Sequence, residues 1–243
     1  PVRQRPSRPG PAISSAPMTD HDDALRRWPW LPSLLAGVAL VLLFGWPALL
    51  HPLSSQMGSA WSEAPGHLWG LWAAADHLFT HGPWVRVAEV GFPEPFVEHL
   101  MDPVNLVVFA PIYWLTGKSA ASAALAWNGL VVGAVGVAAA GAWKLGRRLL
   151  GDDPDAPLAI AVLVVAFAGS SALQGWPTTG RTEYLPAVLA PWHLLLLHRW
   201  LHREGGWWTG IGAALTLGAM AAGGWYLALF AAVLEVPVAL WMA

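Results

Sequence analysis

Acidic side chains gather in one stretch of the chain, where they could act on a hydroxyl group. Glu63 lies shortly after the first apolar segment, and Glu98 and Asp102 lie in a proline-rich strip before the next one. A carboxylate beside an alcohol can take its proton as a general base, an effect of about 10²–10⁴-fold on a rate. We therefore predict Glu63 and Asp102 as catalytic residues, and Glu98 as a substrate-binding residue that could also serve as the base.

A second polar group, Gly180-Arg181-Thr182-Glu183, interrupts the apolar sequence later in the chain. The planar guanidinium of arginine matches the oxygens of a phosphate, and a fixed cation can offset the charge that develops on a leaving phosphate. We predict that Arg181 and Glu183 bind substrate, together with His67, which lies four residues after Glu63.

Each of these residues also has a plainer interpretation, which the sequence leaves open. Glu63 and Asp102 could simply favour the N-termini of helices by charge or by capping. Arg181 and Glu183 could pair with each other at a surface, an interaction worth little. His67 could be an interfacial hydrogen-bonding group.

The sequence predicts no metal site and firmly implies no cofactor. His77 and His81 are four residues apart beside Asp76, a spacing that can bind a metal, but no third ligand lies at a telling distance. Cysteine is absent, and so are the glycine-rich phosphate-binding loops and the common hydrolase motifs. The need for a divalent metal stays open.

The composition indicates that these polar groups are carried by a membrane protein. Hydrophobic residues make up 56% of the 243 residues and charged residues 12%, and the mean hydropathy is +0.48. An average soluble domain has about 25% charged residues, and its interior could not bury this much apolar surface. The net charge of −2 gives no support for a nucleic-acid partner. Membrane lipid is the partner that the composition predicts.

About six segments are apolar and long enough to approach the ~30 Å thickness of a hydrocarbon core. We expect an all-α, polytopic transmembrane bundle with spans at residues 31–50, 120–143, 156–173, 185–200, 207–222 and 225–242. The last two spans are separated by two glycines, so either they form a tight hairpin or the boundary between them is misplaced. Residues 67–81 have one apolar helical face and predict a helix along the membrane surface. Residues 104–117 are too short to cross, and we expect a re-entrant or interfacial helix there.

Lysine and arginine predict the orientation of these spans. Residues 51–117 contain one cation, Arg86, against six acidic residues, whereas arginines precede the first span and Lys144, Arg147 and Arg148 follow the second. Cytoplasmic loops carry the excess of Lys and Arg. We therefore expect a disordered cytoplasmic tail at 1–27 and an extracytoplasmic loop at 51–118, in the cell (inner) membrane. We also expect that residues 1–17 lie upstream of the natural protein, and that the domain at 28–243 is truncated at its C-terminus.

This layout and its motifs resemble the GT-C glycosyltransferase superfamily of bacterial membrane proteins. The resemblance rests on the carboxylate after the first span, H-L-W-x-L-W at 67–72, D-P-x-N-x-x-x-x-x-P at 102–111, G-R-T-E at 180–183 and G-W-Y at 224–226. It covers roughly residues 28–243. One departure concerns the base, because Ser62-Glu63 stands where the family often has aspartate or an acidic pair.

The resemblance implies a function. GT-C enzymes take a sugar from a polyprenyl-phosphate-linked donor, with a catalytic carboxylate in the first outer loop, so we expect transfer to an extracytoplasmic or lipid-linked acceptor. A transporter or lipid-translocating protein is the alternative, since His193 and Glu235 lie within predicted spans and ionisable residues there are functional by default. A non-catalytic component of envelope assembly is a further alternative.

Overall fold

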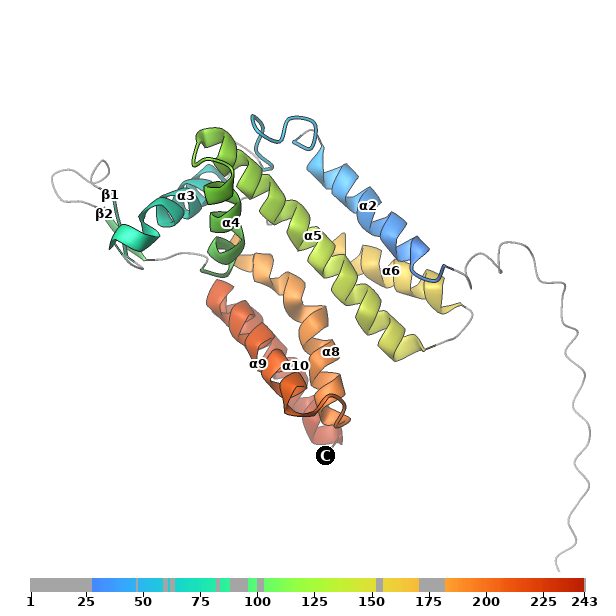
Figure 1. Ribbon diagram of the computed structural model, residues 1–243. Helices are drawn as coiled ribbons and strands as arrows, with labels where there is room; N and C mark the ends of the chain where they lie inside the picture. The colour runs from blue at the N-terminus through green and yellow to red at the C-terminus, as the bar shows by residue number, and fades with distance from the viewer. Residues whose placement is uncertain are drawn as a thin grey trace, which may run out of the picture.

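The computed structural model describes residues 28–46, 48–58, 61, 64–81, 84–87, 96–99, 103–151, 155–170 and 182–242. The predicted tail at 1–27 lies outside these residues. Helices dominate the described chain, as expected, and one short antiparallel hairpin accompanies them (Figure 1). The elements are α2 (Leu31–Gly45), α3 (Ala64–His81), β1 (Trp84–Val87), β2 (Phe96–His99), α4 (Pro103–Leu115), α5 (Ala120–Leu150), α6 (Ala156–Ala168), η1 (Thr182–Leu189), α8 (Ala190–Leu201), α9 (Gly206–Gly223) and α10 (Trp225–Met242).

The helices coincide with the predicted apolar segments, except that one predicted span is not a single continuous α-helix. The segment predicted as a span at 185–200 is divided into the 3-10 helix η1 and the α-helix α8. Pro186 lies inside η1 and Pro191 in the first turn of α8. Proline lacks a backbone N–H and clashes with the preceding turn, so it is tolerated at a helix start but interrupts a continuous α-helix.

Helix α5 is the central element of the fold. Its 31 residues extend over about 46 Å. Ser119 caps its N-terminus by accepting a hydrogen bond from the backbone N–H of Ser122 at 3.1 Å, and Gly151 ends it with a φ of 63°, which favours glycine. Helices α2 and α6 pack against one side of α5, α8 packs against another, and α3 and α4 lie near its N-terminal end (Figure 1).

Helices α9 and α10 form the tight hairpin that was one of the two sequence interpretations. They pack against each other, and only Gly224 separates them. Its backbone N–H donates to the carbonyl of Met220 at 2.9 Å, which closes the last turn of α9. Helix α9 also packs against α8, so α8, α9 and α10 form one helical group.

Basic residues gather at the C-terminal end of α5. At its C-terminal end, Arg148 pairs with Glu204 in the turn between α8 and α9, and Lys144 lies 5.0 Å above the ring of Trp192. Trp30, just before α2, lines the same cavity as Trp143 of α5, so the start of α2 is also at this end. We call it the basic end. The segment around α3 and α4 lies at the opposite end.

In the described part of the chain, α5 is the one helix long and apolar enough to cross a membrane. Helices α2, α4 and α6 are apolar but shorter, with 15, 13 and 13 residues. A buried core helix of a soluble protein meets the same two criteria, so α5 by itself is weak support for a membrane location.

Candidate functional site

Most residues of the predicted catalytic site fall outside the described chain. Glu63, Asp102 and Arg181 are not among the described residues. The backbones of Glu98 and Glu183 lie in β2 and η1, whereas their side chains are outside the description. The arrangement of this site is therefore approached through the elements next to it. His67 is the remaining predicted residue, and it is half-buried in α3.

The elements next to the predicted site residues share one hydrophobic core. Its members include Ala64 at the start of α3, Leu106 in α4 and Leu185 in η1, which are 1%, 4% and 3% exposed. In sequence, Ala64 follows Glu63 directly, and Leu106 and Leu185 each lie four residues after Asp102 and Arg181. Three segments that are far apart in the chain are thus packed together near the N-terminal end of α5.

Asn128 holds the segment after α2 against α5. Its side-chain oxygen accepts from the backbone N–H of Met57 at 2.9 Å, and its amide nitrogen donates to the carbonyls of Pro52 and Ser55 at 3.1 and 2.6 Å. Trp127, fully buried beside it, donates its indole N–H to the carbonyl of Met57 at 2.7 Å. Every polar atom of the Asn128 side chain is engaged, so residues 52–57 are held against α5.

A polar cluster joins α3 to α4. The indole N–H of Trp72 donates to the hydroxyl of Tyr113 at 2.9 Å, and that hydroxyl donates to Asp76 Oδ1 at 3.4 Å. Trp114 donates to the carbonyl of Ala75 at 3.0 Å. Burial raises the pKa of the Tyr113 phenol above its usual value; the Trp72 N–H opposes the rise, and the Asp76 carboxylate adds to it. Tyr113 is therefore a neutral bridge between the two helices.

Comparison with known proteins assigns no role to these contacts. No protein-family model, curated protein or solved structure matches the chain. The GT-C resemblance stays a prediction, and function has to be inferred from the residues themselves.

A second candidate site lies in the group formed by α8, α9 and α10. His193 of α8 and Glu235 of α10 are in contact, with 2.5 Å between Nε2 and Oε1. The side chains are 4% and 17% exposed. The other ring nitrogen, Nδ1, lies 2.8 Å from the carbonyl oxygen of Ala213 and 3.2 Å from Oγ1 of Thr216, both in α9. One buried imidazole thus connects three helices.

The contacts of His193 give its two ring nitrogens different surroundings. A carbonyl oxygen only accepts, so Nδ1 carries a hydrogen and donates it to Ala213. Nε2 then faces the carboxyl group of Glu235, and neither Nε2 nor Oε1 has another hydrogen-bond partner among the residues that the structure describes. The pair is thus an isolated contact between two buried ionisable side chains of α8 and α10.

The structure adds no metal centre to these two sites. Within the residues it describes, no three His, Asp or Glu side chains are grouped so that they could hold a metal ion. His77 is half-buried in α3, and the side chain of His81 is outside the description. The sequence interpretation did not include Asn128, Tyr113 or Thr216. An asparagine inside an apolar helix is a signal that could have indicated the first of these.

Proposed function

We propose that this chain is a multi-pass membrane glycosyltransferase that takes a sugar from a polyprenyl-phosphate-linked donor. In this proposal about six segments cross the membrane, the N-terminus is cytoplasmic and residues 51–118 are extracytoplasmic. The acceptor hydroxyl loses its proton to Glu63 or Asp102. The acceptor oxygen bonds to the anomeric carbon of the sugar as the bond from that carbon to the phosphate oxygen breaks, and Arg181 offsets the charge on the departing polyprenyl phosphate.

The observation that carries this proposal is the shared core of α3, α4 and η1. Ala64, Leu106 and Leu185 belong to one buried cluster, and each is within four residues of a predicted site residue. A reaction that needs a base and a phosphate-binding cation together requires its segments to be neighbours. Packing of these flanking residues supports such a neighbourhood for Glu63, Asp102 and Arg181.

Surface chemistry and charge support the membrane orientation. Large apolar side chains are widely exposed on several helices, for example Leu43 at 71%, Val162 at 68%, Leu215 at 68% and Phe230 at 64%. A soluble monomer rarely leaves extensive apolar patches in water, whereas a lipid-facing surface requires them. At the basic end, Arg148 of α5 pairs with Glu204 in the turn that also carries Arg203, so two connections rich in Lys and Arg lie at the same end, as cytoplasmic loops would.

Helix α4 supports the assignment of residues 51–118 to one side of the membrane. At 13 residues it extends over about 20 Å, as α6 also does, so length alone does not separate the two; α4 differs by its polar link to α3 through Tyr113 and Trp72. It packs against α3 and α5 and contains the buried Phe109 and Tyr113. If α4 does not cross the membrane, successive loops alternate between the two sides in the order that their Lys and Arg content predicts.

Sugar transfer by membranes tests the proposal. Membranes from cells that express the chain receive radiolabelled polyprenyl-phosphate hexoses and pentoses one at a time, and label in acceptors is counted. We expect Glu63→Gln or Asp102→Asn to reduce transfer by about 10²-fold or more, with unchanged amounts of protein in the membrane. Asp76→Asn is the matched control, because it alters an acid of α3 whose partner is Tyr113. Full transfer by both Glu63→Gln and Asp102→Asn would refute the enzymatic proposal.

The His193–Glu235 pair favours a second candidate, a proton-coupled transporter. Buried ionisable residues in membrane helices typically lie on proton or substrate paths, and His193 and Glu235 are two such residues in direct contact. In proteoliposomes with a trapped pH-sensitive dye, this candidate predicts that the protein dissipates an imposed pH gradient and that Glu235→Gln abolishes the flux. Equal flux through the original protein and Glu235→Gln would exclude it.

A further inference from the structure

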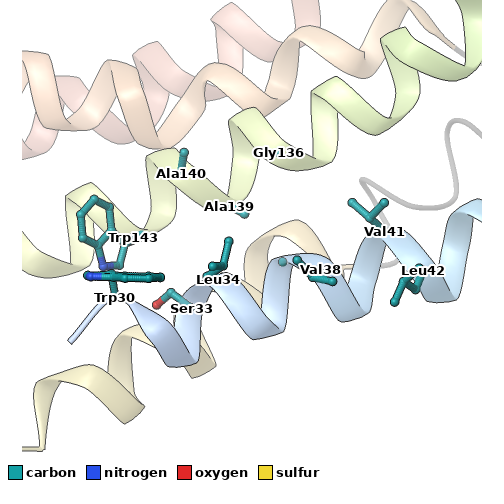
Figure 2. Close-up of a pocket in the computed structure, with 11 residues that line it drawn as sticks. Trp30, Ser33, Leu34, Val38, Val41, Leu42, Gly136, Ala139, Ala140 and Trp143 are labelled. Atoms are coloured by element: carbon teal, nitrogen blue, oxygen red, sulfur yellow. The ribbon is translucent and has the colours of Figure 1, made fainter. Parts of the chain in front are cut away.

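An apolar groove runs between α2 and α5 on the side away from α8. Its cavity volume is about 420 Å³. Leu34 and Val38 of α2, which form part of its wall, are 50% and 47% exposed. Gly136 of α5 leaves space in the groove, since a Cβ atom added there would meet no heavy atom within 4 Å. Figure 2 shows the two helices with these residues facing the space between them.

One end of this groove contains polar atoms that lack partners. Ser33 is 6% exposed, and its Oγ has no hydrogen-bond partner in the protein. Nε1 of Trp143 is also buried without one. Figure 2 shows Ser33, Trp30 and Trp143 together at this end and Val41 and Leu42 toward the other. An indole N–H can only donate and a hydroxyl can donate, and buried donors are normally satisfied. A ligand that satisfies both donors must therefore offer a hydrogen-bond acceptor.

The length of the groove fits one leaflet of a bilayer. From Ser33 to Leu42 the axis of α2 rises by about 14 Å, and half of the ~30 Å hydrocarbon core is roughly 15 Å. A ligand that fills it is a long apolar chain with an acceptor group, such as an ester carbonyl, at one end. That description fits an acyl chain of a membrane lipid.

Basic residues near the polar end of the groove favour a lipid with an anionic headgroup. Trp143 is followed on α5 by Lys144, Arg147 and Arg148, so this end of the groove lies at the basic end. Lys144 lies over Trp192 and Arg148 pairs with Glu204, both on the α8 side of α5, so these cations would act on a headgroup at the membrane surface and not inside the groove. Basic residues at a membrane surface attract anionic headgroups. Trp30 and Trp143 have the amphipathic character typical of a membrane–water boundary.

We propose that the α2–α5 groove binds one acyl chain of an anionic glycerophospholipid, whose ester carbonyl accepts from Ser33 and Trp143. The lipid lies in the leaflet at the basic end. This site is separate from the predicted sugar-transfer site at the other end of α5, and either one can exist without the other.

Two glycines of α5 provide a matched test. Gly133 lies one turn before Gly136, and a Cβ at either position meets nothing within 4 Å. Gly136 lines the groove, and Gly133 is outside its lining. Gly136→Leu should therefore fill the groove without disturbing the packing, while Gly133→Leu adds the same side chain elsewhere on the helix.

Native mass spectrometry of the full chain, released from mild detergent, measures the binding of added phosphatidylglycerol and phosphatidylcholine. We expect the original protein and Gly133→Leu to bind phosphatidylglycerol with equal Kd, and Gly136→Leu to bind it at least about tenfold more weakly. Ser33→Ala should weaken binding roughly three- to tenfold, the effect of one hydrogen bond.

Three results would overturn this proposal. Equal Kd values for Gly136→Leu and Gly133→Leu would show that lipid binds elsewhere. Equal affinity for phosphatidylcholine would exclude selection of an anionic lipid. A groove that retains only detergent and no phospholipid would identify an adventitious apolar surface. Thermal melting of both leucine variants confirms that each is folded before the comparison, and sugar transfer is measured separately, so that the two proposals fail independently.

Discussion

His193 and Glu235 form a buried contact between α8 and α10, with 2.5 Å between Nε2 and Oε1. The imidazole also donates from Nδ1 to the carbonyl of Ala213 in α9. These two ring nitrogens therefore fix three helices relative to one another. Because α10 packs mainly along α9, the contact adds a direct link from α10 to α8.

Replacement of either His193 or Glu235 alone should destabilise the group of α8, α9 and α10 more than replacement of both. His193→Leu leaves the Glu235 carboxyl group without its partner, and Glu235→Leu does the same to Nε2, so each should lower the free energy of unfolding by roughly 1–3 kcal/mol. In the double variant no orphaned polar group of the pair is left, and stability should partly recover. Thermal melts in detergent, combined as a double-mutant cycle, measure the coupling. Strictly additive losses would mean that the two groups do not interact.

Close packing of α5 on α8 should make Gly141 intolerant of even one methyl group. A Cβ at Gly141 would lie 2.7 Å from two ring atoms of Trp192, and that ring is held by a hydrogen bond of 2.9 Å from its Nε1 to the carbonyl of Val137. We expect Gly141→Ala to cost about 1–3 kcal/mol by overpacking.

The control variant for this prediction should change stability in the opposite direction. Gly133→Ala places the same methyl group in open space on the same helix, where alanine is favoured over glycine by roughly 0.5–1 kcal/mol. Melting temperatures of the two variants should therefore move in opposite directions. A stabilised Gly141→Ala would show that α5 and α8 are not in close contact there.

The apolar segments of the sequence were sufficient to locate most helices. Predicted segments at 207–222 and 225–242 correspond to α9 and α10, and the helical periodicity at 67–81 corresponds to α3, which begins three residues earlier. Length and periodicity are local properties, so they can be read from consecutive residues. The hairpin of β1 and β2 was not predicted, although W-V-R-V at its start alternates in the manner of a strand.

Contacts between residues that are far apart in the chain could not be predicted from the sequence. His193 and Glu235 were each recognised as ionisable residues in apolar segments, yet they are 42 positions apart and meet only because the α9–α10 hairpin returns the chain to α8. Asn128 was missed because its partners at 52–57 are more than seventy residues away. For Glu63, Asp102 and Arg181, the local sequence indicates a chemistry, whereas their mutual distances depend on packing that spacing does not encode.

The proposed orientation predicts which surfaces are reached from outside the cell. The chain contains no cysteine, so a single introduced cysteine is a specific label site. Ser54 and Arg203 are exposed, one in the loop after α2 and one at the basic end. We expect a membrane-impermeant maleimide to label Ser54→Cys in intact cells and Arg203→Cys only after the cells are lysed. The reverse pattern would put residues 51–118 in the cytoplasm and would remove the basis for the proposed active site.

Asn128 should be important for the loop that leads to the predicted site. Asn128→Ala removes three hydrogen bonds to residues 52–57 and leaves buried backbone groups unsatisfied, at about 1–3 kcal/mol each. We expect faster amide hydrogen exchange at Ser55 and Met57 and a lower rate of sugar transfer. Ser119→Ala, which alters the cap of the same helix, is the control and should leave exchange at these two residues unchanged. Undisturbed exchange in Asn128→Ala would show that other contacts hold the loop.

Tyr113 should make the packing of α3 on α4 sensitive to alkaline pH. Its hydroxyl donates to Asp76 and accepts from Trp72, and burial raises its pKa above the usual value of 10.0. An unfolded chain would release the phenolic proton near pH 10, before the folded chain does. The folded state therefore retains its full stability below pH 10 and loses stability as pH rises through 10 toward the folded pKa.

Replacement of Tyr113 by phenylalanine isolates this effect from other alkaline changes. Tyr113→Phe should be less stable than the original protein at pH 8, by about 1 kcal/mol for the lost hydrogen bonds. The difference should shrink as pH rises above 10, because the variant has no phenol to ionise at this position. Melting temperatures at matched pH values, together with the ultraviolet absorbance of tyrosinate, measure both quantities. A constant difference across this pH range would mean that Tyr113 ionises equally in the folded and unfolded states, and that its bridge between Trp72 and Asp76 does not depend on the bound proton.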